Sequence, residues 1–286
     1  MKFIQPTSWE EALAAKAAGP ASLPIAGGTD VMVELNFDRQ RPEAILDLTR
    51  VPVLSEWWTE NGRLRVGAGL SYARVIAELG ERLPGLALAS RTVGSPQIRN
   101  RGTIGGNLGA ASPAGDAHPP LLAARADVEL ASTRGVRRIP VRDFYVGPKR
   151  NALADDELIA AIHVAPAGGP EQFSKIGTRN AMVIGACSFA LSIDPVSRRV
   201  GTGIGSAGPT PLVAAEAEAF LEGVLTETGG WEDDAQLAEP ALARFGELVA
   251  SAARPIDDVR STAAYRLHAL AVLARRTLAW TRRGRA

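Results

Sequence analysis

The turn Ala26-Gly27-Gly28-Thr29-Asp30 restricts the possible folds more than any other segment, because it joins two elements of different type. It follows the short apolar run 22–26, which is typical of a strand, and precedes a helical pattern over residues 31–36. Paired glycines permit positive φ angles and close approach to the backbone. The segment therefore predicts a strand–turn–helix unit, whose turn is either purely structural or an anion-binding loop.

A second segment, Arg101-Gly102-Thr103-Ile104-Gly105-Gly106-Asn107, repeats this chemistry with hydroxyl and amide donors, and Ser112-Pro113-Ala114-Gly115-Asp116 follows it. Backbone N–H groups bind phosphate, whereas a carboxylate such as Asp116 suits ribose-like hydroxyls. Two such turns in one domain favour a pyrophosphate site. The competing Gly67-Ala68-Gly69 lacks the remaining residues of the dinucleotide fingerprint, and we interpret it as a structural turn.

Composition excludes several classes of function. The 286 residues include 32 Lys plus Arg and 31 Asp plus Glu, and this net charge of +1 gives no general attraction to nucleic acid. The single cysteine, Cys187, provides neither an internal disulfide nor an iron–sulfur cluster, and the three histidines are scattered. No protein metal site is therefore expected. The chain also lacks a signal-like start and an apolar run of about 20 residues, which predicts a cytoplasmic location.

The most linker-like segment, Ala165-Pro166-Ala167-Gly168-Gly169-Pro170, predicts two domains, residues 1–168 and 169–286. Residues 94–120 are rich in Gly, Pro, Asn and Ser and are expected to form a long functional loop. Apolar patterns predict strands at 44–48, 63–67, 128–132, 136–140, 157–164, 182–193 and 200–206, and helices at 9–18, 72–79, 211–225, 240–252 and 263–282. Ser8 and Glu11 form a capping-box pattern at the first helix. The chain therefore combines predicted strands with predicted helices.

Together these motifs resemble the FAD-binding medium subunit of molybdenum hydroxylases, the family of carbon monoxide, xanthine and nicotine dehydrogenases. The resemblance covers nearly the whole chain and is carried by residues 3–6, 26–30, 95–107, 113–116, 175–179, 205–211 and 257–266. It implies an α+β fold, with a vanillyl-alcohol-oxidase-type (PCMH-type) FAD-binding domain followed by an α+β C-terminal domain of the CO dehydrogenase flavoprotein type.

The resemblance also implies a role for individual residues. Both turns would hold the pyrophosphate and ribityl region of a noncovalent FAD, Asp116 would contact the cofactor, Leu158 would lie by the adenine and Lys175 by the isoalloxazine. This chain has Ser112 and Val183 where many relatives have aspartates, so the flavin's polar surroundings are expected to differ. The turn residues concerned are Ala26, Gly27, Gly28, Thr29, Asp30, Thr103, Ile104, Gly105, Gly106 and Asn107.

The function implied by the resemblance is electron transfer, so no catalytic acid or base is assigned. FAD would take electrons from the [2Fe-2S] clusters of a small subunit, after a large molybdopterin subunit oxidises the substrate, and pass them to an external acceptor. A dimer of such heterotrimers is the expected assembly. One alternative is a self-contained flavin oxidoreductase, for which His118 and Tyr145 are acid–base candidates without a supporting motif. The other is a noncatalytic scaffold. His163, His268 and Cys187 are interpreted as structural.

Overall fold

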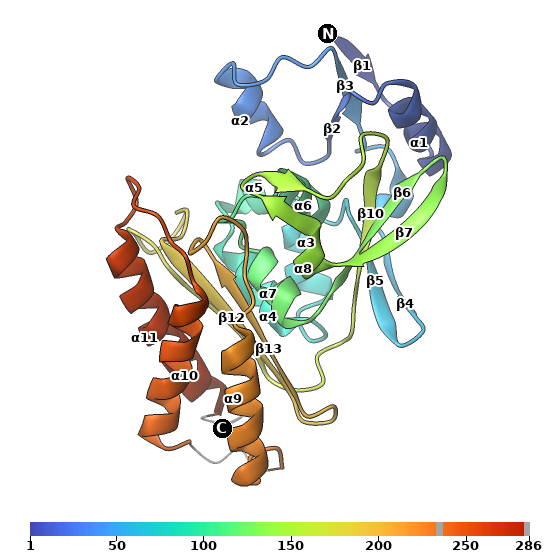
Figure 1. Ribbon diagram of the computed structural model, residues 1–286. Coiled ribbons are helices and arrows are strands. Elements are labelled where there is room, and N and C mark those ends of the chain that lie inside the picture. Colours follow the sequence, from blue (N-terminus) through green and yellow to red (C-terminus); the bar gives the residue numbers. More distant parts are fainter. Residues whose placement is uncertain (233–236, 283–286) are drawn as a thin grey trace.

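A small parallel sheet begins the chain in the computed structural model, which describes residues 1–232 and 237–282. Its strands β1 (Lys2–Ile4), β3 (Ala44–Asp47) and β2 (Leu23–Ile25) lie in that order, connected through α1 (Trp9–Ala18) and α2 (Val31–Asn36) (Figure 1). Glu11 N donates to Ser8 Oγ at 3.1 Å, so the predicted cap of α1 is confirmed. The crossover to α2 places the first glycine turn at the carboxyl end of β2.

A five-stranded antiparallel sheet follows, in the order β4 (Trp57–Glu60), β5 (Arg63–Gly67), β10 (Leu158–Val164), β6 (Asp127–Ser132) and β7 (Gly135–Pro140). Alternate residues such as Leu64, Val66 and Val128 point into the main hydrophobic core. Between β5 and β6 the chain forms α3 (Tyr72–Glu78), α4 (Pro84–Thr92), α5 (Pro96–Arg101), α6 (Ile104–Ala110) and α7 (His118–Ala123). The short elements η1 (Pro52–Ser55), α8 (Val141–Phe144), β8 (Tyr145–Gly147) and β9 (Arg150–Asn151) complete this part.

The expectation of a long loop at 94–120 is therefore wrong. Three short helices occupy this segment. Each begins at a capping residue or a proline, but the abundance of glycine and proline makes the segment resemble a loop. Ser95 Oγ accepts from Ile98 N, and Thr103 Oγ1 accepts from Gly106 N. Prolines stand at the first turn of α5 and of α7, where a missing N–H is tolerated.

The C-terminal part is an antiparallel sheet between two layers of helices. Its strands are β11 (Glu171–Ile176), β12 (Cys187–Asp194) and β13 (Arg199–Gly205), with α9 (Ala215–Glu227), α10 (Glu239–Ala252) and α11 (Ala263–Arg282) on one face (Figure 1). Helices α4 and α7 of the N-terminal part contact the other face. A Cβ on Gly203 would lie 2.0 Å from Pro119 O, so the missing side chain lets the backbone of α7 lie directly on β13.

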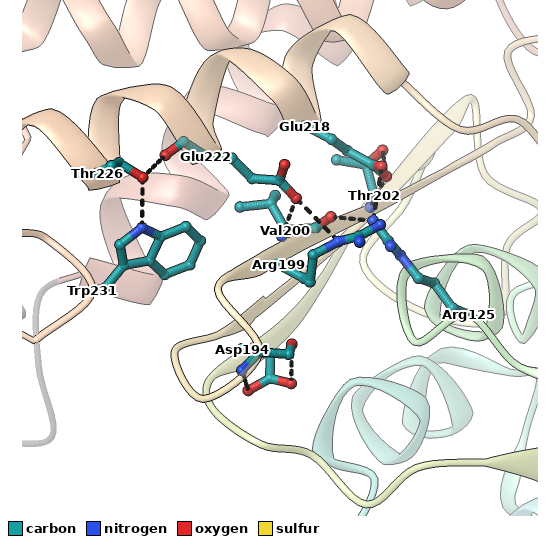
Figure 2. A network of polar contacts seen from close by, with 10 residues as sticks. Arg125, Asp194, Arg199, Val200, Thr202, Glu218, Glu222, Thr226 and Trp231 are labelled. Atoms are coloured by element: carbon teal, nitrogen blue, oxygen red, sulfur yellow. Dashed lines mark hydrogen bonds and ion pairs between the residues drawn. The ribbon is translucent and has the colours of Figure 1, made fainter.

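The outer edge of β13 is closed by side chains (Figure 2). Val200 N donates to Glu222 Oε1 at 2.9 Å, and Thr202 N donates to Glu218 Oε1 at 2.7 Å. Arg125, from the N-terminal part, donates to Val200 O at 2.9 Å. The N–H groups of an edge strand are a template for unwanted pairing, and here α9 and Arg125 occupy this edge and hold the two parts together.

Candidate functional site

The first glycine turn presents a row of free backbone donors. Gly28 has φ +77°, a left-handed conformation that favours glycine. Within the described ranges, none of the N–H groups of residues 27–30 donates to another residue. A Cβ on Gly27 would lie 1.9 Å from Arg101 O, so this turn rests against the second motif. Successive free N–H groups around a left-handed residue bind anions, and this row fits the pyrophosphate of FAD.

The second glycine motif has a different structure from the first. Thr103 caps α6, and the first N–H groups of that helix are used within the fold: Ile104 N donates to Leu70 O, Gly105 N to Ala68 O and Gly106 N to Thr103 Oγ1. Gly105 is required because its Cβ would lie 2.5 Å from the Cβ of Ala68. The sequence suggested backbone donors at both turns. Here the motif offers the exposed edge of Gly106 and the side chain of Asn107 instead.

Asp116 and Lys175 form a buried ion pair that joins the two parts of the chain. Asp116 precedes α7, Lys175 lies in β11, and their Oδ2 and Nζ atoms are 2.6 Å apart. The side chains are only 10% and 8% exposed, and Thr92 Oγ1 lies 3.2 Å from the same carboxylate oxygen. Burial raises the pKa of Asp116, and the Lys175 ammonium opposes that rise. Both residues were predicted site residues, but their direct contact is visible only in the structure.

A buried polar cluster lies next to these segments. Tyr145 Oη is 2.8 Å from His118 Nδ1, and the two rings pack edge to face. A Cβ on Gly115 would lie 2.3 Å from His118 Nε2 and 2.9 Å from Asn107 Oδ1, so these two atoms flank one point. Over residues 1–232 and 237–282, both atoms and Tyr72 Oη are buried without a hydrogen-bond partner. Buried polar atoms are normally paired, so these three atoms are the unpaired part of a buried polar cluster.

Leu158 and Ile104 do not present their side chains to the turns. Leu158 begins β10 and is 2% exposed within the main hydrophobic core, and Ile104 is fully buried there. Any contact with a ligand would involve their backbone atoms, and both roles stay predictions. Conversely, Tyr72 was not singled out from the sequence, although its ring packs beside Gly102 and its N–H donates to Gly102 O at 3.0 Å. A tyrosine in an amphipathic helix gives no signal of such a position.

Several other sequence motifs have structural roles. Arg266, from the 257–266 motif, donates to Ala186 O at 2.7 Å and to Ser206 O at 2.6 Å, which ties α11 to the ends of β12 and β13. His163 Nε2 lies 2.6 Å from Glu129 Oε2 on the outer face of the five-stranded sheet. In the described part of the chain, no group of His, Cys, Asp and Glu could hold a metal ion, and no helix is long and apolar enough to cross a membrane.

Comparisons with known proteins agree with this geometry. A family model described as the FAD binding domain in molybdopterin dehydrogenase matches residues 1–167, and one described as the CO dehydrogenase flavoprotein C-terminal domain matches residues 172–281. The xanthine dehydrogenase FAD-binding subunit of Escherichia coli O157:H7 is 29% identical over 272 residues, which cover 92% of this chain and 89% of that protein. The nicotine 6-hydroxylase medium subunit of Paenarthrobacter nicotinovorans is 29% identical over 287 residues, with 97% and 96% covered.

Among solved structures, the chain is similar to carbon monoxide dehydrogenase from Hydrogenophaga pseudoflava, in a form that lacks the Mo-pyranopterin moiety of its molybdenum cofactor. The TM-score is 0.88 at 26% identity, and the match covers 99% of this chain and 98% of that chain. The α+β fold expected from the sequence is confirmed, with an FAD-binding domain followed by a CO dehydrogenase flavoprotein C-terminal domain.

Proposed function

The chain belongs to the family of FAD-binding domains of molybdopterin dehydrogenases, and from this premise we propose that it is the electron-transfer subunit of such an oxidoreductase. It would take electrons from the [2Fe-2S] clusters of a small subunit and pass them to an external acceptor. The observation that carries this proposal is the row of free N–H groups at residues 27–30. These donors suit a pyrophosphate, which is the part that distinguishes FAD from smaller flavins.

The residues of this chain would bind and tune the flavin. Residues 26–30 would hold the pyrophosphate through their backbone, and Asn107 would offer its amide beside them. Bound FAD would supply the two-electron redox chemistry. Lys175 would place a buried cation close to the ring, where it favours negative charge on the reduced form, while Asp116 holds the lysine side chain in place.

The proposed partners are a large molybdopterin subunit and a small [2Fe-2S] subunit, assembled as a dimer of heterotrimers. The similarity of this chain to proteins named as FAD-binding or medium subunits supports a place in a complex of several subunits. The only cysteine in the sequence, Cys187, is buried, and burial raises its pKa to about 12, so it is a weak candidate for a redox role. A cytoplasmic location is proposed for the complex.

The geometry disfavours a self-contained oxidase that uses His118 and Tyr145. The two side chains contact each other and are 0% and 8% exposed as residues, so neither faces a substrate. Burial lowers the pKa of His118 to about 3 and raises that of Tyr145. At neutral pH both groups are therefore uncharged and poorly suited to exchange protons.

The experiment that tests the proposal compares three flavins. The full chain is freed of flavin and titrated with FAD, FMN and riboflavin, and binding is followed by flavin fluorescence. FAD is expected to bind at least about tenfold more tightly than the others, since only FAD carries a pyrophosphate. Equal affinity for FAD and riboflavin would refute the assignment of the turn. In the assembled complex, substrate should bleach the flavin only when the iron–sulfur subunit is present.

A further inference from the structure

Helix α4 lies at the junction of the two parts of the chain, and side chains of β11 hold both of its ends. At the first turn, Gly85 N donates to Glu171 Oε2 at 3.0 Å, while the capping residue Leu83 supplies no side-chain bond. At the last residue, Thr92 O lies 3.5 Å from Lys175 Nζ. An acid thus lies at the helix N-terminus and a cation at the C-terminus, as the helix dipole favours.

The contact between α4 and β11 has a fixed register. Alternate residues of β11 point to the same side of the strand, and they meet one face of α4 in the same order along both elements. Between the two end contacts, Phe173 packs with Ala89 in a small apolar cluster. A Cβ on Gly85 would lie 3.1 Å from Glu171 Oε2, so the glycine lets the acidic side chain lie over the first turn.

We propose that Glu171 is a positioning residue for the Asp116–Lys175 pair. By holding the N-terminal end of α4, it sets the position of β11 at which the Lys175 ammonium reaches Asp116. The inference rests on the proposed function in one respect only, namely that the Asp116–Lys175 pair acts on a bound flavin. The position of the strand is a property of the chain itself.

The physical reason lies in the short reach of the ion pair. A hydrogen bond of 2.6 Å between Lys175 and Asp116 tolerates a displacement of a few tenths of an ångström, whereas one residue of strand spans about 3.3 Å. Glu171 directly follows the linker at 165–170. Within this linker, the structure shows a backbone hydrogen bond to the N-terminal part from Ala167 N to Arg82 O, at 2.8 Å. Strand β11 is paired with β12 over residues 171–176, and Pro170 O accepts from Ile193 N, so loss of the Glu171 contact would leave the strand in its sheet. It would remove the tie that fixes this end of the sheet against α4.

The test compares Glu171→Ala, which removes the acceptor, with Glu171→Gln, which keeps it. The matched control is Glu81→Gln, because Glu81 lines the same cavity of 720 Å³ as Glu171, and the described structure gives its side chain no hydrogen bond. The first readout, on the full chain, is competitive acetylation of Lys175 measured by mass spectrometry. Glu171→Ala is expected to raise the labelling rate by about fivefold or more. Glu171→Gln and Glu81→Gln should label like the wild type.

The second readout is the midpoint potential of bound FAD. Glu171→Ala is expected to shift it in the same direction as Lys175→Met, and Glu171→Gln should restore the wild-type value. Wild-type labelling and potential in Glu171→Ala would overturn the inference, provided that Lys175→Met still shifts the potential. If FAD does not bind, the proposed function fails, and if Lys175→Met leaves the potential unchanged, Lys175 lies away from the flavin ring. In either case the labelling result alone decides the role of Glu171. Should Glu171→Ala not fold, Glu171→Asp makes the same comparison, because its carboxylate is one methylene too short.

Discussion

At Gly106, the effect of an added side chain on folding can be separated from its effect on ligand binding. A Cβ here would meet Thr103 Oγ1 at 3.0 Å, the one neighbour within 4 Å among the described residues, and the position is exposed. Gly106→Ala should therefore change the free energy of unfolding by no more than about 1 kcal/mol. Its methyl group would still obstruct close approach of a pyrophosphate, and we expect FAD affinity to fall about tenfold or more.

The matched control for this prediction is Gly223→Ala. Gly223 lies in α9, and a Cβ on it would have no described neighbour within 4 Å. That variant should bind FAD as the wild type does. The measurements are thermal unfolding and fluorescence titration of both variants, and unchanged FAD affinity in Gly106→Ala would remove Gly106 from the site.

The Asp116–Lys175 pair leads to a prediction about stability. Lys175→Met leaves the Asp116 carboxyl buried without its cation, which typically costs about 3 kcal/mol or more in unfolding free energy. Adding Asp116→Asn removes the buried negative charge as well, and part of the lost unfolding free energy should be regained. Denaturant unfolding of the two single variants and the double variant measures this coupling. Additive losses would show that the two side chains do not depend on each other.

At the scale of elements, the sequence predicted those that have periodic apolar residues and recognisable caps. The pattern at Trp9–Ala18 and the hairpin β6–β7 are present at nearly the expected bounds. Strand β11 was missed because Glu171 and Lys175, whose side chains are largely buried, are charged, so its sequence lacks apolar alternation. Helix α4 was missed because Gly80, Pro84 and Gly85 resemble a helix end.

The same limit applies to the candidate site. Glycines, hydroxyls and a carboxylate at fixed spacing revealed the two turns and Asp116. Contacts between distant segments determine three further features of the site. They leave the N–H groups of residues 27–30 free, they occupy the first N–H groups of α6, and they pair Asp116 with Lys175. Such contacts leave no local pattern in one sequence. The site residues could therefore be nominated from the sequence, but their division of roles could not.

The capping contact of α4 predicts a pH dependence. Burial raises the pKa of Glu171 from 4.5 to about 7, and the Gly85 N–H partly opposes this. Because the pKa is raised on folding, the protonated Glu171 carboxyl favours the folded state. This stabilisation is fully present below the unfolded pKa of about 4.5 and is lost as the pH rises through about 7. Relative to Glu171→Gln, which does not titrate, the wild type should lose up to about 3 kcal/mol between pH 5 and 8.

Urea unfolding of both proteins across this pH range measures the difference. The other charged groups lining the same cavity, Glu78, Glu81, Arg82 and Arg91, are present in both proteins and largely cancel in the comparison. Parallel stability curves would show that Glu171 does not titrate in this range.

At the scale of the whole molecule, the two parts are built to act together. The C-terminal sheet is covered by α9–α11 on one face and by α4 and α7 on the other. Arg125, Glu171 and the Asp116–Lys175 pair add polar contacts across the same junction. Each part therefore completes the hydrophobic and electrostatic surroundings of the other, and the candidate site lies where residues of both meet.

The last prediction concerns what the isolated chain cannot do. With one cysteine, it lacks the four thiolates of an ordinary [2Fe-2S] cluster, and its described residues offer no metal site. Under the proposed function, electrons enter from a partner, so the chain alone should bind FAD yet show no substrate-dependent reduction of a dye. Expression with the large and small subunits should produce iron–sulfur absorption bands and turnover together. The assay compares the isolated chain with the co-expressed complex, on N-heteroaromatic, aldehyde and carbon monoxide substrates. Turnover of any of them by the isolated flavoprotein would contradict the electron-transfer role and favour a self-contained oxidoreductase.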